Sequence, residues 1–219
     1  SIMILMEQGK LRLNDTIGKF IPDIDDEQAK RVTIQQLLTH TSGYRPDFDL
    51  GEKWTGREGM LAALKKEKLR NPPGTRFVYS DIGFIVLGEI QRRISKVGPE
   101  LFFATKIQGP LNASGDMGFN NWPSEPSVKM IKAIKWAIPI APTENTKGQQ
   151  SYLGGQFQGE GSEGDVILRG YVHDPTAFRM GGVAGHAGLF STAEDLARYC
   201  QMLLNGGVLN GKRIMSAQT

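Results

Sequence analysis

Apolar residues recur at helical spacing in several stretches of the chain, at residues 1–8, 33–40, 55–69, 80–94 and 191–204. Three of these stretches begin with the capping-box pattern, in which Ser or Thr precedes Glu or Gln by three residues, at Thr33, Thr55 and Ser191. The stretch 80–94 is apolar on most of its sides, which predicts a buried helix with Ser80 as its N-cap.

Extended segments are few, and loops take much of the remaining chain. Residues 166–168 predict a strand, and residues 77–79 predict a short extended piece. Residues 109–164 are rich in Gly, Pro, Asn and Ser, which predicts a long irregular connection with one short helix at 127–137. Residues 181–188 form a loop dense in glycine. The chain is therefore expected to be mostly helix and loop.

The composition is that of a globular domain and excludes several functional classes. Hydrophobic residues make up 39% and charged residues 22%, which argues against disorder. The formal net charge of +3 over 219 residues is too small to indicate nucleic-acid binding. The single cysteine, Cys200, excludes an internal disulfide and shares an apolar helix face with Leu196, which predicts a core position. The histidines lack the HExxH spacing of zinc proteases, and we predict no metal site.

Two glycine motifs have the spacing of nucleotide-binding loops but the wrong context. Residues 159–164 match GxGxxG, yet no strand pattern precedes them and no helix pattern follows, as a dinucleotide site requires. Residues 206–212 have P-loop spacing, but Arg213 replaces the Ser or Thr that binds magnesium. A nucleotide-binding protein is thus a weak alternative, which a strand before residue 159 would support.

Four segments in a fixed order resemble a known family over nearly the whole chain. Residues 6–15 read MEQGKLRLND, residues 33–43 read TIQQLLTHTSG, residues 72–83 read PPGTRFVYSDIG, and residues 181–197 read GGVAGHAGLFSTAEDLA. Together they resemble the serine β-lactamase and penicillin-binding-protein-like family, in its class C, DD-carboxypeptidase and esterase branch. The resemblance implies an α/β fold of the β-lactamase/DD-peptidase-like type, in which an antiparallel sheet is flanked by helices and joined to a helical subdomain.

The resemblance also implies an acyl-enzyme mechanism that uses no metal or cofactor. Family members acylate the Ser of an SxxK motif, whose spacing places Ser and Lys on one helix face. Tyr79 stands at the position of the family tyrosine that relays protons between this Ser and the leaving group. A tyrosine serves as a base near neutral pH only if nearby cations favour its anion. A later KTG-like strand lines the substrate site and contributes to the oxyanion hole.

The chain departs from the family pattern in three ways. No Ser is followed by Lys three residues later, so we expect the SxxK motif upstream of Ser1. No KTG-like strand is present, so we expect it beyond Thr219. Residues 1–219 are therefore predicted to be a partial domain, truncated at both ends. Asp81 stands where the family often has Asn, and its charge disfavours an anionic Tyr79 unless a Lys compensates.

Four residues are predicted to belong to the active site. Tyr79 and Asp81 are assigned catalytic roles, and Tyr79 must then face a cleft near the glycine-dense loop instead of lying among packed apolar side chains. His186 and Gly188 are assigned to substrate binding, because their loop borders the substrate cleft in the family. Structural roles stay open for Tyr79 at a strand-to-helix corner, for Asp81 as a helix-dipole partner, and for His186.

Two other histidines are expected to be structural. His40 follows a predicted helix and is expected to cap its last carbonyl groups. His173 and Asp174 are adjacent, and neighbouring side chains point apart in an extended chain, so a paired dyad of the two is disfavoured.

The predicted function is a serine hydrolase that acts through an acyl-enzyme on a D-alanyl peptide, β-lactam or ester, although residues 1–219 lack the nucleophile. The alternative is a non-catalytic module of the same fold that binds cell-wall peptides or a partner. The expected partners are a small-molecule or cell-wall peptide substrate and no nucleic acid. The first eight residues are too few for a membrane span or a signal peptide, and the resemblance implies a periplasmic or extracellular location.

Overall fold

The structure of the chain is a computed structural model that describes residues 1–113, 117–122, 139–146 and 167–219. The helices are α1 (Ile2–Glu7), α2 (Ile17–Phe20), α3 (Glu27–Lys30), α4 (Ile34–Leu38), α5 (Gly56–Lys66), α6 (Asp81–Ser95), α7 (Pro99–Phe103), the π-helical η1 (Ala104–Gln108), α8 (Gly109–Leu111), α10 (Pro175–Arg179) and α11 (Ala193–Leu204). The strands are β1 (Gly118–Phe119), β2 (Pro142–Asn145), β3 (Ile167–Arg169), β4 (Leu189–Phe190), β5 (Val208–Leu209) and β6 (Lys212–Arg213). Helices and loops therefore dominate, as the sequence predicts.

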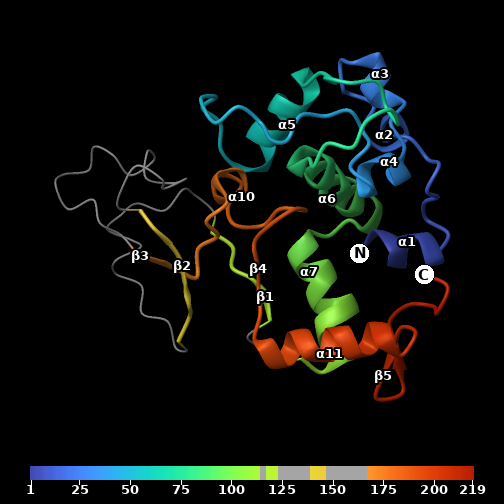
Figure 1. Cartoon of the computed structure of the whole chain (residues 1–219), viewed down its shortest axis with the longest axis vertical. Helices are drawn as coiled ribbons and strands as arrows, with labels where there is room; N and C mark the ends of the chain where they lie inside the picture. Colours follow the sequence, from blue (N-terminus) through green and yellow to red (C-terminus); the bar gives the residue numbers. More distant parts are fainter. Residues whose placement is uncertain (114–116, 123–138, 147–166) are drawn as a thin grey trace.

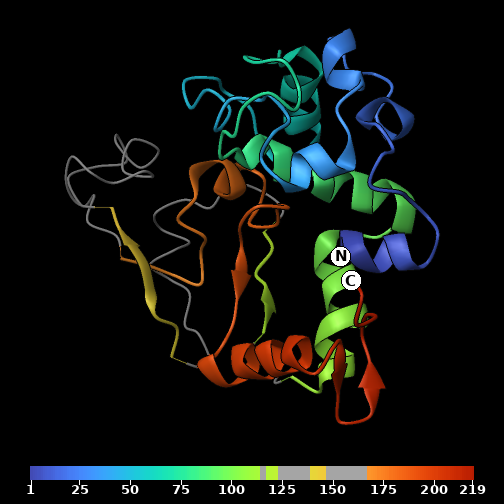
Figure 2. The same cartoon turned by 45° about the vertical axis from the view of Figure 1, so that its right-hand side comes forward.

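The helices gather in two groups (Figure 1). Helices α2 to α6 form one group, and α7, α8 and α11 form the other with the β5–β6 hairpin (Figure 2). Within the described residues the strands pair as β1–β4, β2–β3 and β5–β6, and each pair is antiparallel. The described helices are too short or too polar to cross a lipid bilayer.

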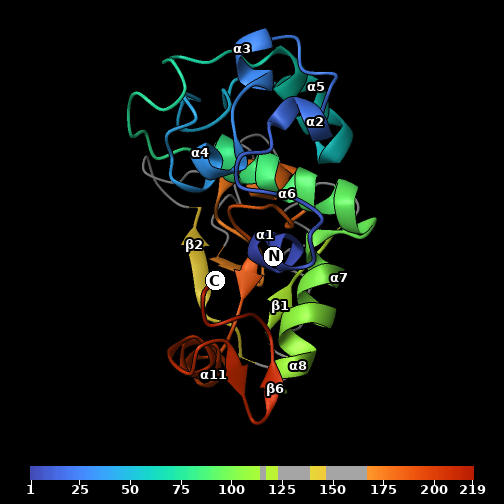
Figure 3. The same cartoon turned by 90° about the vertical axis from the view of Figure 1, so that its right-hand side faces the viewer.

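The two ends of the described chain lie side by side (Figure 3). The carboxylate of Glu7, at the end of α1, accepts a hydrogen bond from the backbone N–H of Ser216 at 2.6 Å. The same carboxylate accepts a hydrogen bond from the hydroxyl of Thr219. Gly9 follows α1 with a positive φ of 69°, the conformation predicted for the residue after a helix end.

Helix α6 is the buried helix that the sequence predicts. Its N-cap is Ser80, whose hydroxyl accepts a hydrogen bond from the N–H of Gly83 at 3.3 Å. The same hydroxyl donates to the carbonyl oxygen of Arg45 at 2.7 Å, which ties the start of the helix to a neighbouring loop. The buried side chains of α6 include Ile82, Ile85, Val86 and Ile90, and they belong to the main hydrophobic core.

A buried carboxylate joins α6 to α5. Glu89 on α6 has a side chain that is 1% exposed, and it accepts hydrogen bonds from Arg57 on α5 at 2.9 and 2.6 Å. Arg93, one turn later on α6, donates to the same carboxylate at 2.7 Å. Two guanidinium groups thus compensate one carboxylate, which a buried charge requires.

The three predicted capping boxes have different outcomes. At Thr33 the box is confirmed, because the Thr33 hydroxyl accepts from Gln36 N–H and the Gln36 side chain accepts from Thr33 N–H. At Thr55 the helix forms, but the Thr55 side chain makes no capping hydrogen bond. In the last helix the N-cap is Thr192 instead of Ser191, since it is the Thr192 hydroxyl that reaches the N–H three residues later, at 3.1 Å.

The core face predicted for the last helix is wrong. Cys200 is exposed, and Leu203 and Leu204 are 46% and 82% exposed. The helix α11 instead buries Asp195 and Met202. Among the described elements, α8 and β5 lie against α11, and Met202 belongs to the main hydrophobic core.

The predicted strand at 166–168 is confirmed from Ile167 onward as β3. Residues 77–79 run between loops and α6 without pairing to a described strand. The described parts of the predicted connection 109–164 contain α8, β1 and β2. The helix predicted at 127–137 and the motif at 159–164 lie outside the described residues.

Candidate active site

Tyr79 is an exposed aromatic residue held by a histidine. Its side chain is 64% exposed, and its ring stacks on the ring of His40 with 4.5 Å between centroids. The His40 ring also stacks on Phe84 of α6, at 4.9 Å. Tyr79 is thus outside the packed core and directly before the N-cap of α6, which meets one of the two conditions set by its predicted role.

His40 organises the backbone on both sides of Tyr79. Its carbonyl oxygen accepts from the N–H of Val78 at 2.9 Å, and its Nδ1 accepts from the N–H of Ser80 at 3.1 Å. Nδ1 is therefore unprotonated and cannot donate to a carbonyl group. The role predicted for His40, a cap over the last carbonyls of its helix, is wrong, because the ring packs on Tyr79 and Phe84 and accepts the Ser80 hydrogen bond.

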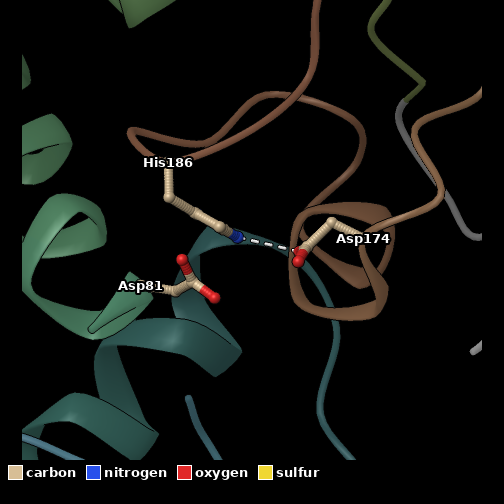
Figure 4. A group of neighbouring side chains, drawn as sticks. All are labelled: Asp81, Asp174 and His186. Atoms are coloured by element: carbon tan, nitrogen blue, oxygen red, sulfur yellow. Dashed lines mark hydrogen bonds and ion pairs between the residues drawn. The ribbon is translucent and has the colours of Figure 1, made fainter. Parts of the chain in front are cut away.

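Asp81, the first residue of α6, is half-buried and directed toward two other ionisable side chains. Its backbone N–H donates to the carbonyl oxygen of Pro46 at 2.7 Å. Figure 4 shows the carboxylate pointing toward Asp174 and His186. One side-chain oxygen or nitrogen from each of the three residues lies within 4.8 Å of the other two. The sequence predicted Asp81 and His186 as site residues, and the fold brings them together.

Asp174 is the residue that links these groups, and it was not among the predicted site residues. Its Oδ1 accepts a hydrogen bond from the N–H of Ala177 at 2.7 Å and thereby caps α10. The same atom lies 2.8 Å from Nε2 of His186 (Figure 4). Pro175 occupies the first position of α10, so the Asp-Pro pair was the sequence signal for a helix start. His173 is exposed, and Asp174 pairs with His186.

The glycine-dense loop reaches α6 because Gly185 has no side chain. A Cβ at Gly185 would lie 2.0 Å from the carbonyl oxygen of Phe84 and 3.0 Å from the amide nitrogen of Gly88, both on α6. This backbone-to-backbone contact places the next residue, His186, over the start of α10, with a side chain that is 4% exposed. Gly188 lies apart from this contact, because its close neighbours are Gly182 and Phe119.

The negative charges of nearby carboxylates affect the protonation of His186 and Asp174. Burial lowers the pKa of His186, but the hydrogen bond to Asp174 and the charges of Asp174, Asp81 and Asp47 outweigh it, so the net pKa is raised. Burial raises the pKa of Asp174, yet the hydrogen bond and charge of His186 prevail and the net pKa is lowered. Both directions favour an imidazolium–carboxylate pair.

Two further carboxyl groups, Asp81 and Asp47, have raised pKa values, unlike Asp174. Burial raises the pKa of Asp81, the charge of His186 only partly offsets this, and the charges of Asp174 and Asp47 add to it. Burial also raises the pKa of Asp47, against the hydrogen bond that its Oδ2 accepts from the Thr176 hydroxyl at 2.7 Å. Asp47 has no sequence signal for a site role, since only the fold places it beside α10.

The three side chains of Figure 4 have atom types that bind divalent cations, but His186 and Asp174 are separated by a hydrogen-bond distance. Two ligands ~2.0–2.1 Å from a tetrahedral zinc ion lie ~3.4 Å apart. The 2.8 Å between His186 Nε2 and Asp174 Oδ1 instead suits a shared proton. The arrangement is an acid–imidazole pair beside a third carboxyl group, and it is suited to proton and charge chemistry.

Comparisons with known proteins identify the family of the chain. A family model described as "Beta-lactamase" matches residues 1–219. A protein of Escherichia coli (strain K12) named "Putative D-alanyl-D-alanine carboxypeptidase" is 30% identical over 237 residues, which cover 98% of this chain and 50% of that protein. The chain spans about half the length of the curated relatives it matches.

Solved structures show the same fold. The octameric penicillin-binding protein homologue from Pyrococcus abyssi is similar with a TM-score of 0.64 and 24% identity, covering 99% of this chain and 44% of that one. A class C beta-lactamase is similar with a TM-score of 0.61 and 20% identity, covering 93% of this chain and 46% of that one. These likenesses confirm the predicted β-lactamase/DD-peptidase-like fold. Because the family model also matches every residue, the chain belongs to the beta-lactamase family.

Proposed function

We propose that the complete protein is a serine hydrolase that forms an acyl-enzyme with a D-alanyl peptide, a β-lactam or an ester. The observation that carries this proposal is the placement of Tyr79, whose exposed ring is stacked on His40 directly before α6. An exposed phenol held by ring stacking and by the hydrogen bonds of its neighbours is oriented without being buried. The carboxypeptidase name of the relatives and the family match support the same reaction class.

In this proposal Tyr79 moves protons and the serine forms the bond. The hydroxyl oxygen of the SxxK serine attacks the substrate carbonyl, and its proton passes to the Tyr79 oxygen. The bond to the leaving group breaks, and Tyr79 returns the proton to the leaving nitrogen or oxygen. A water molecule then attacks the ester bond between the serine and the acyl group. Tyr79 takes a proton from this water and gives a proton to the departing serine oxygen. The SxxK lysine and the KTG-like strand belong to the complete protein and favour the anion of Tyr79.

The other predicted site residues have supporting roles. Asp81 sets the charge at the start of α6, beside Tyr79. The imidazole of His186 is buried and bonded to Asp174, so its contribution passes through these neighbours. Gly188 is buried against Gly182 and Phe119, and it shapes the loop that borders the substrate.

The cellular location follows from the proposed substrates. D-Alanyl peptides and β-lactams meet their enzymes at the bacterial cell wall, so we propose a periplasmic or extracellular location. Fractionation of cells that express the complete gene tests this, and recovery of the protein in the cytoplasmic fraction would contradict it.

The test of the proposed function is covalent labelling of the full-length protein with a fluorescent penicillin. We expect one labelled serine, identified by mass spectrometry within an SxxK motif upstream of residue 1. A chromogenic ester and an acyl-D-alanyl-D-alanine peptide then separate esterase from carboxypeptidase activity. Binding of the peptide without labelling or hydrolysis would instead favour the non-catalytic binding module.

A further inference from the structure

The start of α6 carries an acidic residue at a position where the family often has a neutral one. The family often has Asn at the position of Asp81, which is neutral. In this chain Asp81 lies within 4.8 Å of the interacting atoms of Asp174 and His186, and Asp47 also contributes to its electrostatic environment. Three carboxyl groups therefore share a half-buried region at the start of α6, two residues after Tyr79 in the chain.

One cation from the described residues lies inside this group. The Nε2 atom of His186 is 2.8 Å from Asp174, and the side chain is 4% exposed, so water screens its charge poorly. Nδ1 of His186 makes no hydrogen bond to the residues that the structure describes. The groups that face the imidazole are thus Asp174 from α10, Asp81 from α6 and Asp47 from the loop before α5.

We propose that His186 is a positioning residue that acts as the compensating cation of this site: anchored by Asp174, it offsets the charge that Asp81 places beside Tyr79. This inference rests on the proposed function and refines it. The compensating charge that a lysine provides in the family mechanism is here supplemented by a buried histidine. The loop that Gly185 holds against α6 then has an electrostatic purpose as well as a structural one.

Compensation by a histidine is confined to a pH window. Below the pKa of Asp81, which is raised, the carboxyl is neutral and needs no cation. Above the pKa of His186, also raised, the imidazole is neutral and offers none. His40, on which Tyr79 stacks, is the other imidazole near Asp81. Removing His186 should therefore matter most between these two limits.

The experiment measures the acylation rate of the full-length protein by a fluorescent penicillin between pH 4.5 and 9.5. We expect His186→Gln to slow acylation about tenfold at intermediate pH, as one uncompensated neighbouring charge would, and the deficit to shrink at both extremes. The deficit caused by His186→Gln should be smaller in the Asp81→Asn background, where only the charge of Asp174 is left without its partner. Lys66→Gln, which removes an exposed cation at the end of α5, is the control and should behave as the wild type.

A second measurement keeps the test decisive if His186→Gln folds poorly. NMR titration of the histidine rings in the wild type and in Asp81→Asn should show a His186 midpoint above the ordinary value, which falls in the variant. A pH-independent deficit, a failure of Asp81→Asn to rescue, or a His186 midpoint that Asp81→Asn leaves in place would overturn the inference. If the wild type is not labelled at all, the proposed function fails and the inference fails with it.

Discussion

Asp81, Asp174 and His186 illustrate how single side chains depend on their neighbours. Each group alone, buried to this degree, would favour its neutral form. The 2.8 Å hydrogen bond reverses that preference for Asp174 and His186, whereas Asp81 keeps a raised pKa. Asp174 and His186 can thus both be charged although they lie next to Asp81, whose pKa is raised.

Replacing Tyr79 with Phe tests the predicted proton relay. The change removes the hydroxyl and leaves the ring that stacks on His40. We expect kcat of the full-length protein to fall by ~10²–10⁴, the usual contribution of general acid–base catalysis. Tyr199→Phe on α11 is the matched control and should retain the wild-type rate. An unchanged kcat in Tyr79→Phe would remove Tyr79 from the mechanism.

The stability contribution of His186 should depend on pH. Its pKa is raised in the folded state, so its stabilising effect is complete below the unfolded value of ~6.5 and is lost as pH rises through the folded pKa. Urea denaturation at pH 5.5 and 9 should therefore show a larger gap in unfolding free energy between wild type and His186→Gln at the lower pH. Equal gaps at both pH values would mean that His186 is neutral in the folded protein.

At the scale of elements, α6 positions the site from one helix. Its first turn carries Asp81, its N-cap follows Tyr79, its second turn receives the glycine-dense loop, and its third turn is tied to α5. The predicted helix from Ser80 was correct because capping and apolar periodicity are local signals. The loop contact was not predicted, because Gly185 contacts residues that are distant in the chain.

Adding a methyl group at Gly185 should separate the loop from α6. The new Cβ would lie 2.0 Å from the carbonyl oxygen of Phe84, and helix backbone cannot move aside easily. We expect Gly185→Ala to reduce the free energy of unfolding by about 1–3 kcal/mol, as overpacking does. Gly118→Ala, where a Cβ meets nothing within 4 Å, is the control and should change stability by under about 0.5 kcal/mol. Urea denaturation that shows equal effects for both would contradict the close contact.

The ion pairs of Glu89 and Glu194 should differ in strength. Glu89→Ala removes the hydrogen bonds that this carboxylate accepts from Arg57 and Arg93, and we expect a loss of about 1.5–3 kcal/mol. Glu194, whose side chain is 79% exposed, pairs with Arg198 at the surface, and Glu194→Ala should cost at most about 1 kcal/mol. Thermal and urea denaturation of both variants provide the comparison, and similar losses would show that burial of Glu89 is unimportant.

At the scale of the whole molecule, the chain has the proposed proton relay but no SxxK serine among its 219 residues. We therefore expect the 219-residue polypeptide to remain unlabelled by a fluorescent penicillin and to leave a chromogenic ester intact, under conditions in which the full-length protein reacts. Mass spectrometry of the treated chain is the measurement. A covalent adduct on any serine within residues 1–219 would show that the nucleophile had been placed wrongly.

Short-range patterns were sufficient for the helices from Ser80 and Thr33, for the strand from Ile167 and for the position of Tyr79 before a helix. Caps, turns and periodicity act over a few residues, so they can be recognised without the fold. The family resemblance added the predicted chemistry, through motifs that are also contiguous in the chain.

Other features depended on segments that meet only after folding. The pair of Asp174 with His186, the nearby Asp47, and the support of Tyr79 by His40 join separate loops and helices. The exposure of Cys200 likewise depends on which elements cover α11 and not on the helix pattern. Charges and ring contacts act through space, so the tertiary structure decided which carboxyl groups share the imidazole and therefore the direction in which the pKa of each one is shifted.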